Sequence, residues 1–361
     1  MKILTFSRYD KLGASSRLRL YQYIDCLESA GIELEIVPFF NDDYILGLYK
    51  KEISTVSITK AYFRRFSYML KIRKFDLVWV EKEMLPWIPS CMELGLFAAD
   101  IPLVVDYDDA VFHRYDQHRL SIVRKILGKK IDGIMKRANL VVAGNEYIAN
   151  HARMAGASKV AIIPTVVDVG RYELLVSHSN SIPIIGWIGS PATTKFLSQI
   201  IPVLKEVLAI RKVKLVAVGG DVNQLIDLPI AVLPWAEETE VRDIQTFDIG
   251  IMPLPDEPFE RGKCGYKLIQ YMACGKAVVA SPVGVNKDIV ANQVDGYLAT
   301  SHEEWVFALT KLIDDAELRN KMGSAGRKKV EASYSLGGAS KQLIDLLQET
   351  HHEFFLKNIA S

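Results

Sequence analysis

Residues 258–284, PFERGKCGYKLIQYMACGKAVVASPVG, restrict the fold of this chain more than any other stretch. They have the pattern of a glycine-containing loop, a helix and a buried strand. One helical face would carry the apolar residues Tyr266, Ile269, Met272 and Ala273. Gly275 stands where a helix ends, and the apolar run 277–280 is typical of a strand covered on both faces. The stretch therefore predicts one unit of an α/β protein.

The loop of this stretch is basic, because it carries Arg261 and Lys263, and Lys267 follows in the first helical turn. Cations beside the free amides of a helix start favour an anion. An ordinary loop–helix–strand unit with solvated lysines explains the same residues equally well, so the loop alone does not decide the function.

Strand–helix alternation continues through both halves of the chain. We expect first-half strands near 3–6, 33–38, 76–80, 103–105, 140–142 and 160–163, and second-half strands near 183–189, 213–218, 230–233, 248–252, 277–280 and 296–298. Helices are expected at 118–138, 302–314, 316–322 and 324–332, among others. The pattern predicts an α/β protein of two doubly wound domains facing a central cleft. Their bounds are 1–165 and 183–339, with a linker at 166–182 and a final helix at 340–361 returning to the first domain.

Composition narrows the class of protein. Of 361 residues, 49% are hydrophobic, and the net charge is +1, so nothing global indicates nucleic acid. The four cysteines lack disulfide or zinc spacing, which suits a reducing cytosol. The first residues begin at once as a strand, and no run of about 18 uncharged apolar residues follows. We expect a cytoplasmic protein without a signal peptide or a membrane span.

Acidic residues follow the strand at 103–105 in the first half. Asp106, Asp108 and Asp109 lie where parallel sheets usually bind ligands. Capping of the next helix would explain one of these acids but hardly three. A metal site is not supported, because no further metal ligands occur at a recognisable spacing. Near the first glycine turn, Arg17 and Arg19 could meet a phosphate or be exposed helix residues.

A second helix start lies in the second half, directly after the strand at 183–189. Ser190 and Pro191 are a strong cap and first turn, and Lys195 follows closely enough to share an anion with the helix amides. The next two strands end at Gly219 and Trp235. Because such sheets bind ligands at their strand ends, we assign both residues to the same binding site.

The order of these motifs resembles the GT-B glycosyltransferases, specifically the large retaining family 4. The resemblance rests on IIGWIGSPATTKFL, LVAVGG, DIGIMPLP, KLIQYMACGKAVVASPVGVNKDIV and DGYLA, in that order. It covers nearly the whole chain and is strongest from Pro183 to about Tyr334. YMACGKAVVAS is its most specific part.

This resemblance implies a nucleotide-sugar donor held mainly by the second domain, an acceptor on the first, retention at the anomeric carbon and no required metal or other cofactor. Lys195 matches the family's diphosphate lysine. Gly13 matches the glycine turn that lets the backbone approach the donor. The family arginine that precedes the lysine matches Ser190, and Arg261 and Lys263 are candidates to replace it.

Two family glutamates are absent at the matching positions. The glutamate that holds the ribose falls on Gln270, and the one that contacts the transferred sugar falls on Gly262, for which Glu260 is a nearby substitute. A family histidine falls on about Asp108. We therefore assign catalytic roles to Asp106, Asp108, Lys195 and Glu260. The residues that we assign to the donor site are Gly13, Ser190, Lys195, Gly219, Trp235, Arg261, Lys263, Lys267 and Gln270.

The acceptor is expected to be a glycan or a lipid-linked molecule in surface polysaccharide or glycolipid synthesis. Residues 60–74 and 124–137 are basic, and the first of these stretches also carries aromatic residues, so both could lie on the inner face of an anionic membrane. A solvated basic helix face is the simpler interpretation. A non-catalytic nucleotide-sugar-binding or scaffold protein and an epimerase of the same fold are the alternatives. A nicotinamide oxidoreductase is disfavoured, because no matching glycine motif follows a strand.

Overall fold

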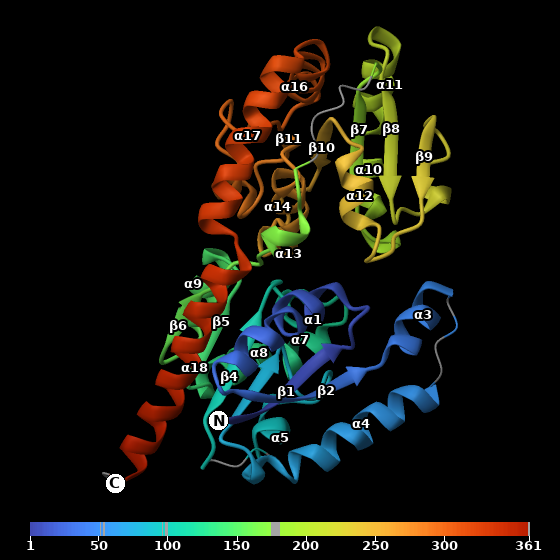
Figure 1. The fold of residues 1–361 in the computed structure, drawn as a ribbon. Coiled ribbons are helices and arrows are strands. Elements are labelled where there is room, and N and C mark those ends of the chain that lie inside the picture. Colours follow the sequence, from blue (N-terminus) through green and yellow to red (C-terminus); the bar gives the residue numbers. More distant parts are fainter. Residues whose placement is uncertain (51, 53–54, 96, 98–99, 175–180, 360–361) are drawn as a thin grey trace. The chain divides into compact units, whose positions relative to one another are not determined.

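The computed structural model describes the chain except residues 51, 53–54, 96, 98–99, 175–180 and 360–361. It divides into two compact units (Figure 1). The first unit comprises Met1–Thr165, Gly262–Cys264 and Gly337–Ser361, and the second comprises Val166–Arg261 and Gly265–Leu336. Six residues of the expected linker, and the last two of the expected final helix, lie outside the described residues.

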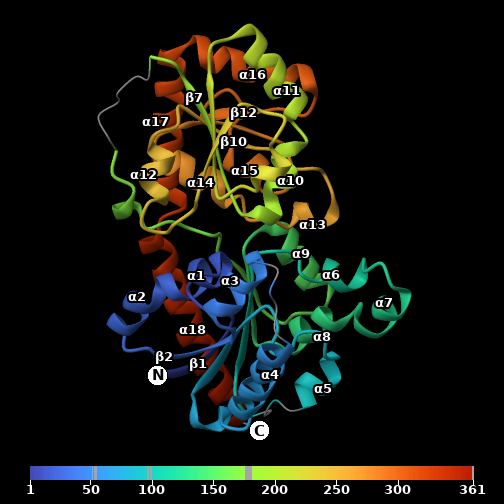
Figure 2. The same cartoon turned by 90° about the vertical axis from the view of Figure 1, so that its right-hand side faces the viewer.

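A six-stranded parallel sheet forms the centre of the first unit, in the order β2-β1-β3-β4-β5-β6. The strands are β1 (Lys2–Tyr9), β2 (Glu33–Phe40), β3 (Leu77–Glu81), β4 (Leu103–Tyr107), β5 (Leu140–Ala143) and β6 (Val160–Ile162). The helices are α1 (Ala14–Arg19), α2 (Ile24–Ser29), α3 (Asp42–Lys50), α4 (Thr55–Met69), α5 (Ser90–Gly95), α6 (His113–Asp116), α7 (Ser121–Leu127), α8 (Lys130–Arg137), α9 (Glu146–Met154) and α18 (Leu336–Ile359). Figure 2 shows α2 and α18 on one side of this sheet and α4, α5 and α8 on the other.

The second unit repeats this plan around the order β12-β11-β10-β7-β8-β9, again all parallel. Its strands are β7 (Ile184–Ile188), β8 (Lys214–Val218), β9 (Ile230–Leu233), β10 (Ile249–Met252), β11 (Ala277–Ala280) and β12 (Gly296–Leu298). Its helices are α10 (Thr194–Ser198), α11 (Ile201–Ile210), α12 (Glu240–Gln245), α13 (Pro258–Arg261), α14 (Tyr266–Ala273), α15 (Asn286–Ile289), α16 (His302–Asp314) and α17 (Ala316–Ser333). One core packs α10, α11 and α16 on the sheet, and the other packs α12, α14 and α17.

Short 3-10 turns complete the two units. They are η1 (Tyr21–Tyr23) and η2 (Ile72–Lys74) in the first unit, and η3 (Val169–Arg171), η4 (Pro191–Thr193) and η5 (Val222–Gln224) in the second.

Two predictions of where a helix breaks or continues were wrong. The single helix expected at 118–138 is broken between α7 and α8, where the chain turns and the side chain of Lys130 becomes buried. The two helices expected at 316–322 and 324–332 form a single helix, α17, in which Gly323 is an interior residue. A Cβ at Gly323 would lie 1.9 Å from the Gly275 carbonyl oxygen, so this glycine serves close packing and does not end the helix.

The final helix begins at Leu336, four residues before the expected start. Polar contacts join it to β6 and to the residue directly before β6. Lys159 pairs with Glu349 and Glu353 of α18 at 2.9 and 3.3 Å, and Gln342 donates a hydrogen bond to the Ile162 carbonyl.

Each sheet has one place where the strand order reverses. In the first sheet β1 is followed by β2 on one side and has β3 on the other, and in the second β7 is followed by β8 on one side and has β10 on the other. Ligands of doubly wound sheets bind at the carboxyl ends of the strands at such points. Binding sites are therefore expected after β1 and β3, and after β7 and β10.

Candidate active site

A compact group of charged and hydroxyl side chains lies at the reversal point of the first sheet. Ser15 comes from the start of α1, Lys82 directly follows β3, and Asp108 directly follows β4. The Lys82 ammonium lies 3.1 Å from Asp108 Oδ1 and donates to Ser15 Oγ at 2.7 Å. Ser15 Oγ is also within hydrogen-bond distance of Asp108 and of Glu81. We call Ser15, Lys82 and Asp108 the first-unit cluster.

The first-unit cluster is charged at neutral pH. Burial acts to raise the pKa of Asp108, but Lys82 and the Ser15 hydroxyl lower it below its ordinary value. Burial acts to lower the pKa of Lys82, but Asp108 and Glu81 raise it. The predicted site residue Asp108 is thus a carboxylate held by two partners, able to orient a hydroxyl group.

Asp106 lies in a different environment from Asp108. Its two oxygens accept hydrogen bonds from Arg19 Nε at 2.7 Å and Nη2 at 3.1 Å, and Arg19 also donates to the Ile163 carbonyl. Burial raises the pKa of Asp106 to about 6, against the effect of this guanidinium. Arg19 is therefore neither exposed nor placed for phosphate, and the catalytic role expected for Asp106 stays a prediction, with its carboxylate already engaged.

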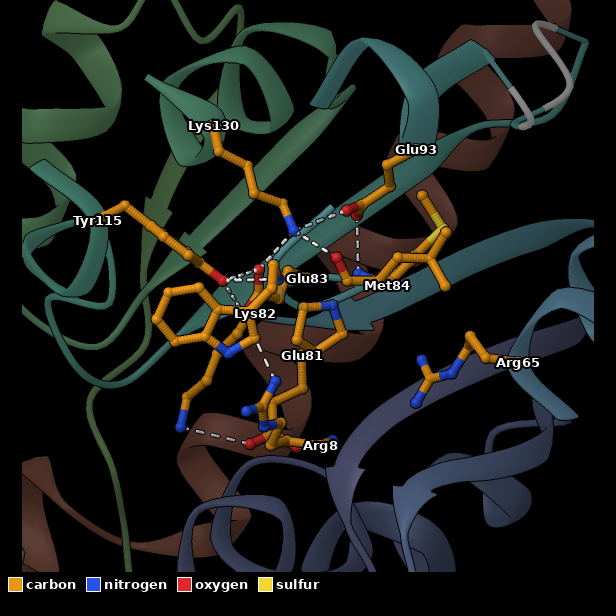
Figure 3. A network of polar contacts seen from close by, with 12 residues as sticks. Arg8, Arg65, Glu81, Lys82, Glu83, Met84, Glu93, Tyr115 and Lys130 are labelled. Atoms are coloured by element: carbon orange, nitrogen blue, oxygen red, sulfur yellow. Dashed lines mark hydrogen bonds and ion pairs between the residues drawn. The ribbon is translucent and has the colours of Figure 1, made fainter. Parts of the chain in front are cut away.

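A buried network continues from β3 away from the cluster (Figure 3). Lys130 of α8 lies between Glu83, at 2.6 Å, and Glu93 of α5, at 3.1 Å. Tyr115 donates to both oxygens of Glu83, and Arg8 lies 3.4 Å from the same carboxylate. Burial acts to raise the pKa of Glu83, but Lys130 and Arg8 lower it.

The sequence interpretation missed Ser15, Glu81, Lys82 and Glu83. The missing signal was the charged triplet at 81–83, which directly follows the apolar run LVWV and directly precedes buried Met84 and Leu85. Charges within an apolar run indicate buried ion pairs, since isolated buried charges are strongly disfavoured.

The second sheet brings two glycines and a tryptophan together after the ends of β7, β8 and β9. A Cβ at Gly219, which has a left-handed φ of +75°, would lie 2.2 Å from the Gly189 carbonyl oxygen and 3.0 Å from Trp235 Cβ. Only glycine allows this close approach of the loops after β7 and β8. Trp235 in turn donates from Nε1 to Glu240 at 3.1 Å. The predicted residues Gly219 and Trp235 therefore belong to one group.

Two lysines belong to the elements around the end of β7. Lys195 is exposed on α10, the helix after β7, and Lys267 of α14 lies 5.7 Å from the ring centre of Trp187, near the end of β7. Ser190 caps the intervening turn, where its N–H donates to the Thr193 hydroxyl at 3.0 Å. Because η4 and α10 have only three and five residues, their dipoles are weaker than the sequence suggested. The side-chain cations must carry more of any anion binding here.

Gln270 is buried on α14, and its amide donates to the Tyr172 hydroxyl at 3.2 Å. Gly13 is the N-cap residue directly before α1 in the first unit, where a Cβ would lie 2.3 Å from Tyr9 Cβ. The glycine thus also serves local packing.

The basic loop divides between the two units. Arg261 pairs with Asp256 at 2.6 Å in the second unit, and Glu260 is buried on the same short helix, α13. Residues 262–264 belong to the first unit, where Asn145 donates to the carbonyls of Gly262 and Lys263 at 2.9 and 3.2 Å. A Cβ at Gly262 would lie 2.4 Å from Ala110 Cβ, which explains why a glycine occupies this position.

A cavity of about 540 Å³ lies in the second unit at the ends of β10 and β11. Its lining includes Asp256, Ser281, Lys287, His302 and Trp305. None of the residues that we assigned to the donor site is among its lining within the described part of the chain. In that same part, no helix has both the length and the apolarity needed to cross a bilayer.

Comparison with known protein families finds a match within the second unit. Residues 182–315 match the family described as glycosyl transferases group 1. No curated protein sequence matches the chain.

Solved structures match nearly all of the chain. Sucrose-phosphate synthase from Thermosynechococcus elongatus is 15% identical with a TM-score of 0.74, covering 97% of this chain and 98% of its own. Anabaena HepE in complex with UDP is 17% identical with a TM-score of 0.68, covering 97% and 100%. The apo lipopolysaccharide outer core galactosyltransferase WaaB is 14% identical with a TM-score of 0.65, covering 97% and 99%. These likenesses confirm the predicted fold class, two parallel doubly wound sheets of the GT-B type.

Proposed function

We propose that this chain is a glycosyltransferase that uses a nucleotide-sugar donor, because residues 182–315 match the family described as glycosyl transferases group 1. It transfers the sugar with retention to a glycan or a lipid-linked acceptor in surface polysaccharide or glycolipid synthesis. We further propose a UDP-linked hexose as the donor. The similar structure of HepE, crystallised with UDP and with UDP-glucose, supports this choice.

The observation that carries the donor assignment is the group at the end of β7. The approach of Gly219 to the Gly189 carbonyl leaves the loops after β7 and β8 without side chains at that point, beside Trp235. Lys195 and Lys267 supply positive charge from the elements next to β7. Backbone and cations without bulky side chains suit a diphosphate, and the neighbouring Trp235 ring suits a flat base.

The reaction needs positive charge at the leaving group. The bond between the anomeric carbon and the β-phosphate oxygen breaks, the acceptor oxygen bonds to that carbon, and the acceptor proton passes to the departing phosphate. Negative charge grows on the diphosphate as the bond breaks, and Lys195 and Lys267 stabilise it. Arg261 and Lys263 are further candidates for contacting the diphosphate. Arg261 is the weaker of them on its own, because it is paired with Asp256.

The first unit is proposed to hold the acceptor and the transferred sugar. Ionised Asp108, fixed by Lys82 and Ser15, accepts hydrogen bonds from sugar hydroxyls. Gln270 can accept from and donate to the ribose diol without charge, and Glu260 is the available carboxylate near the position of Gly262. Asp106 holds Arg19 and supports the strand end that carries Asp108.

Helix α4 is proposed to lie on the inner face of the membrane. The exposed apolar residues Val56 and Phe63 of α4, and Leu70 directly after its last residue, are spaced seven apart and so lie along one side. Lys60, Arg64 and Lys71 add exposed positive charge. Apolar side chains beside cations match an anionic bilayer surface. Leu120, Ile122 and Ile126 are likewise exposed at α7, next to Arg124 and Lys125.

Transfer is tested with purified protein, a membrane lipid extract and labelled hexoses on UDP, GDP or ADP. We expect label from a UDP-linked hexose to enter the lipid fraction, and NMR of the product to show the anomeric configuration of the donor. A protein that binds UDP but transfers no label from any donor would refute the proposed reaction and support a binding protein.

Membrane binding is tested by sedimentation with anionic and neutral vesicles. The Phe63→Ala/Leu70→Ala double variant should bind anionic vesicles more weakly than wild type, and 0.5 M salt should release part of the bound protein by screening. A Met154→Ala variant, altered at an exposed residue of α9, is the control. Equal binding to neutral and anionic vesicles would contradict the electrostatic part of the proposal.

A further inference from the structure

The segment that follows β3, residues 82–88, has an unusual backbone. Of the non-glycine residues described, three have a left-handed φ, and two of them are Lys82 at 68° and Trp87 at 63°. This conformation is unfavourable for bulky side chains, and it persists where surrounding contacts enforce it, often at binding sites.

The contacts that enforce it are polar and at least partly buried. The Lys82 N–H donates to the Asp106 carbonyl at 2.9 Å, and the Trp87 N–H donates to the Tyr115 hydroxyl at 3.1 Å. Tyr115 is fixed by Glu83, which Lys130 holds in turn (Figure 3). From α4, Tyr62 donates to the Pro86 carbonyl. The segment is thus fixed at both ends and in its middle.

These contacts hold one large apolar side chain at the surface. Residues 81–86 are all buried, whereas Trp87 is 44% exposed. Trp79, Trp187 and Trp305 are at most 3% exposed. The Trp87 ring packs edge-on against Tyr115 and His118, with ring centres 5.2 and 5.7 Å apart. A rigid, exposed indole of this kind loses little conformational entropy when it binds a ligand.

We propose that Trp87 is a binding platform for a pyranose ring of the acceptor glycan. The C–H face of a pyranose packs on the electron-rich face of an indole. The segment starts at Lys82 of the first-unit cluster, which the proposed function assigns to sugar hydroxyls, so the inference rests on that function. Trp87 is a specificity-determining residue that holds the acceptor and takes no part in bond breaking.

The kinetic test compares wild type with Trp87→Phe and Trp87→Ala, using the UDP-hexose donor and increasing lipid extract. We expect Trp87→Ala to raise the half-saturating acceptor concentration about tenfold, and Trp87→Phe, which keeps a ring, to raise it about threefold or less. The KM for the donor and its acceptor-independent hydrolysis should not change. Met154→Ala is the surface control. Equal acceptor dependence in wild type and Trp87→Ala would overturn the proposal.

A fluorescence test separates a sugar platform from a membrane anchor. The difference in emission between wild type and Trp87→Phe isolates Trp87. We expect octyl glucoside or octyl galactoside, below its micellar concentration, to change this emission, and octanol to leave it unchanged. Quenching by vesicles of brominated lipid, without any response to the glycosides, would identify a membrane contact and overturn the proposal. If the wild type transfers no sugar, the proposed function fails, and this titration still decides the role of Trp87.

Discussion

At the scale of single residues, the first unit depends on buried charges that satisfy each other. Lys130 is 1% exposed, forms ion pairs with both Glu83 and Glu93, and donates a hydrogen bond to the Leu85 carbonyl. Removing one partner of such a group leaves the others charged and buried, which costs more than the original pairing gained.

Lys130→Met should therefore lower the free energy of unfolding by about 3–5 kcal/mol. The adjacent Lys129 is exposed, so Lys129→Met is a matched control and should change stability by less than about 0.5 kcal/mol. Urea unfolding followed by circular dichroism measures both. Similar stability of the two variants would mean that the buried network contributes little.

The same network predicts a pH dependence through Glu83. Its pKa is lower in the folded protein than in the unfolded chain, so its contribution to stability is complete above the unfolded value of about 4.3 and is lost as the pH falls through the folded value. The difference in unfolding free energy between wild type and Glu83→Gln should be constant from pH 7 to pH 5 and should shrink below pH 4. A difference that grows on acidification would contradict the assigned direction.

At the scale of elements, local sequence signals were sufficient to predict helix starts and ends that depend on nearby residues. The cap at Ser190 and the helix end at Gly275, which has a φ of +67°, were both predicted and are both present. What could not be predicted depends on distant partners. Arg19 and Asp106 are 87 positions apart, and Lys130 and Glu83 are 47 apart. No periodicity in the sequence connects such residues.

The continuity of α17 gives a direct test of packing by a glycine. Gly323→Ala should destabilise the protein by about 1–3 kcal/mol, because the new Cβ would press on the Gly275 carbonyl. Gly337→Ala in α18 meets no atom within 4 Å and should be neutral or stabilising by up to about 1 kcal/mol. Thermal unfolding compares them, and equal shifts in Tm would contradict the packing argument.

At the scale of the whole molecule, each unit has candidate site residues after the carboxyl ends of its own strands. The sequence predicted both doubly wound sheets and placed Asp108, Gly219 and Trp235 at strand ends. It did not reveal that Asp106 is engaged by Arg19, or that Arg261 pairs with Asp256, because both pairings depend on the folded chain. The fold was therefore more accessible from the sequence than the partners of individual site residues.

The proposed function depends on a nucleoside diphosphate being held by the lysines of the second unit. Isothermal titration of UDP and uridine into the full-length protein tests it most directly, with Lys195→Ala as the variant and Lys205→Ala, at an exposed lysine of α11, as the control. We predict that UDP binds more tightly than uridine, and that Lys195→Ala weakens UDP about tenfold or more while leaving uridine and the control unchanged. Equal affinities for UDP and uridine, or full UDP affinity in Lys195→Ala, would contradict the account.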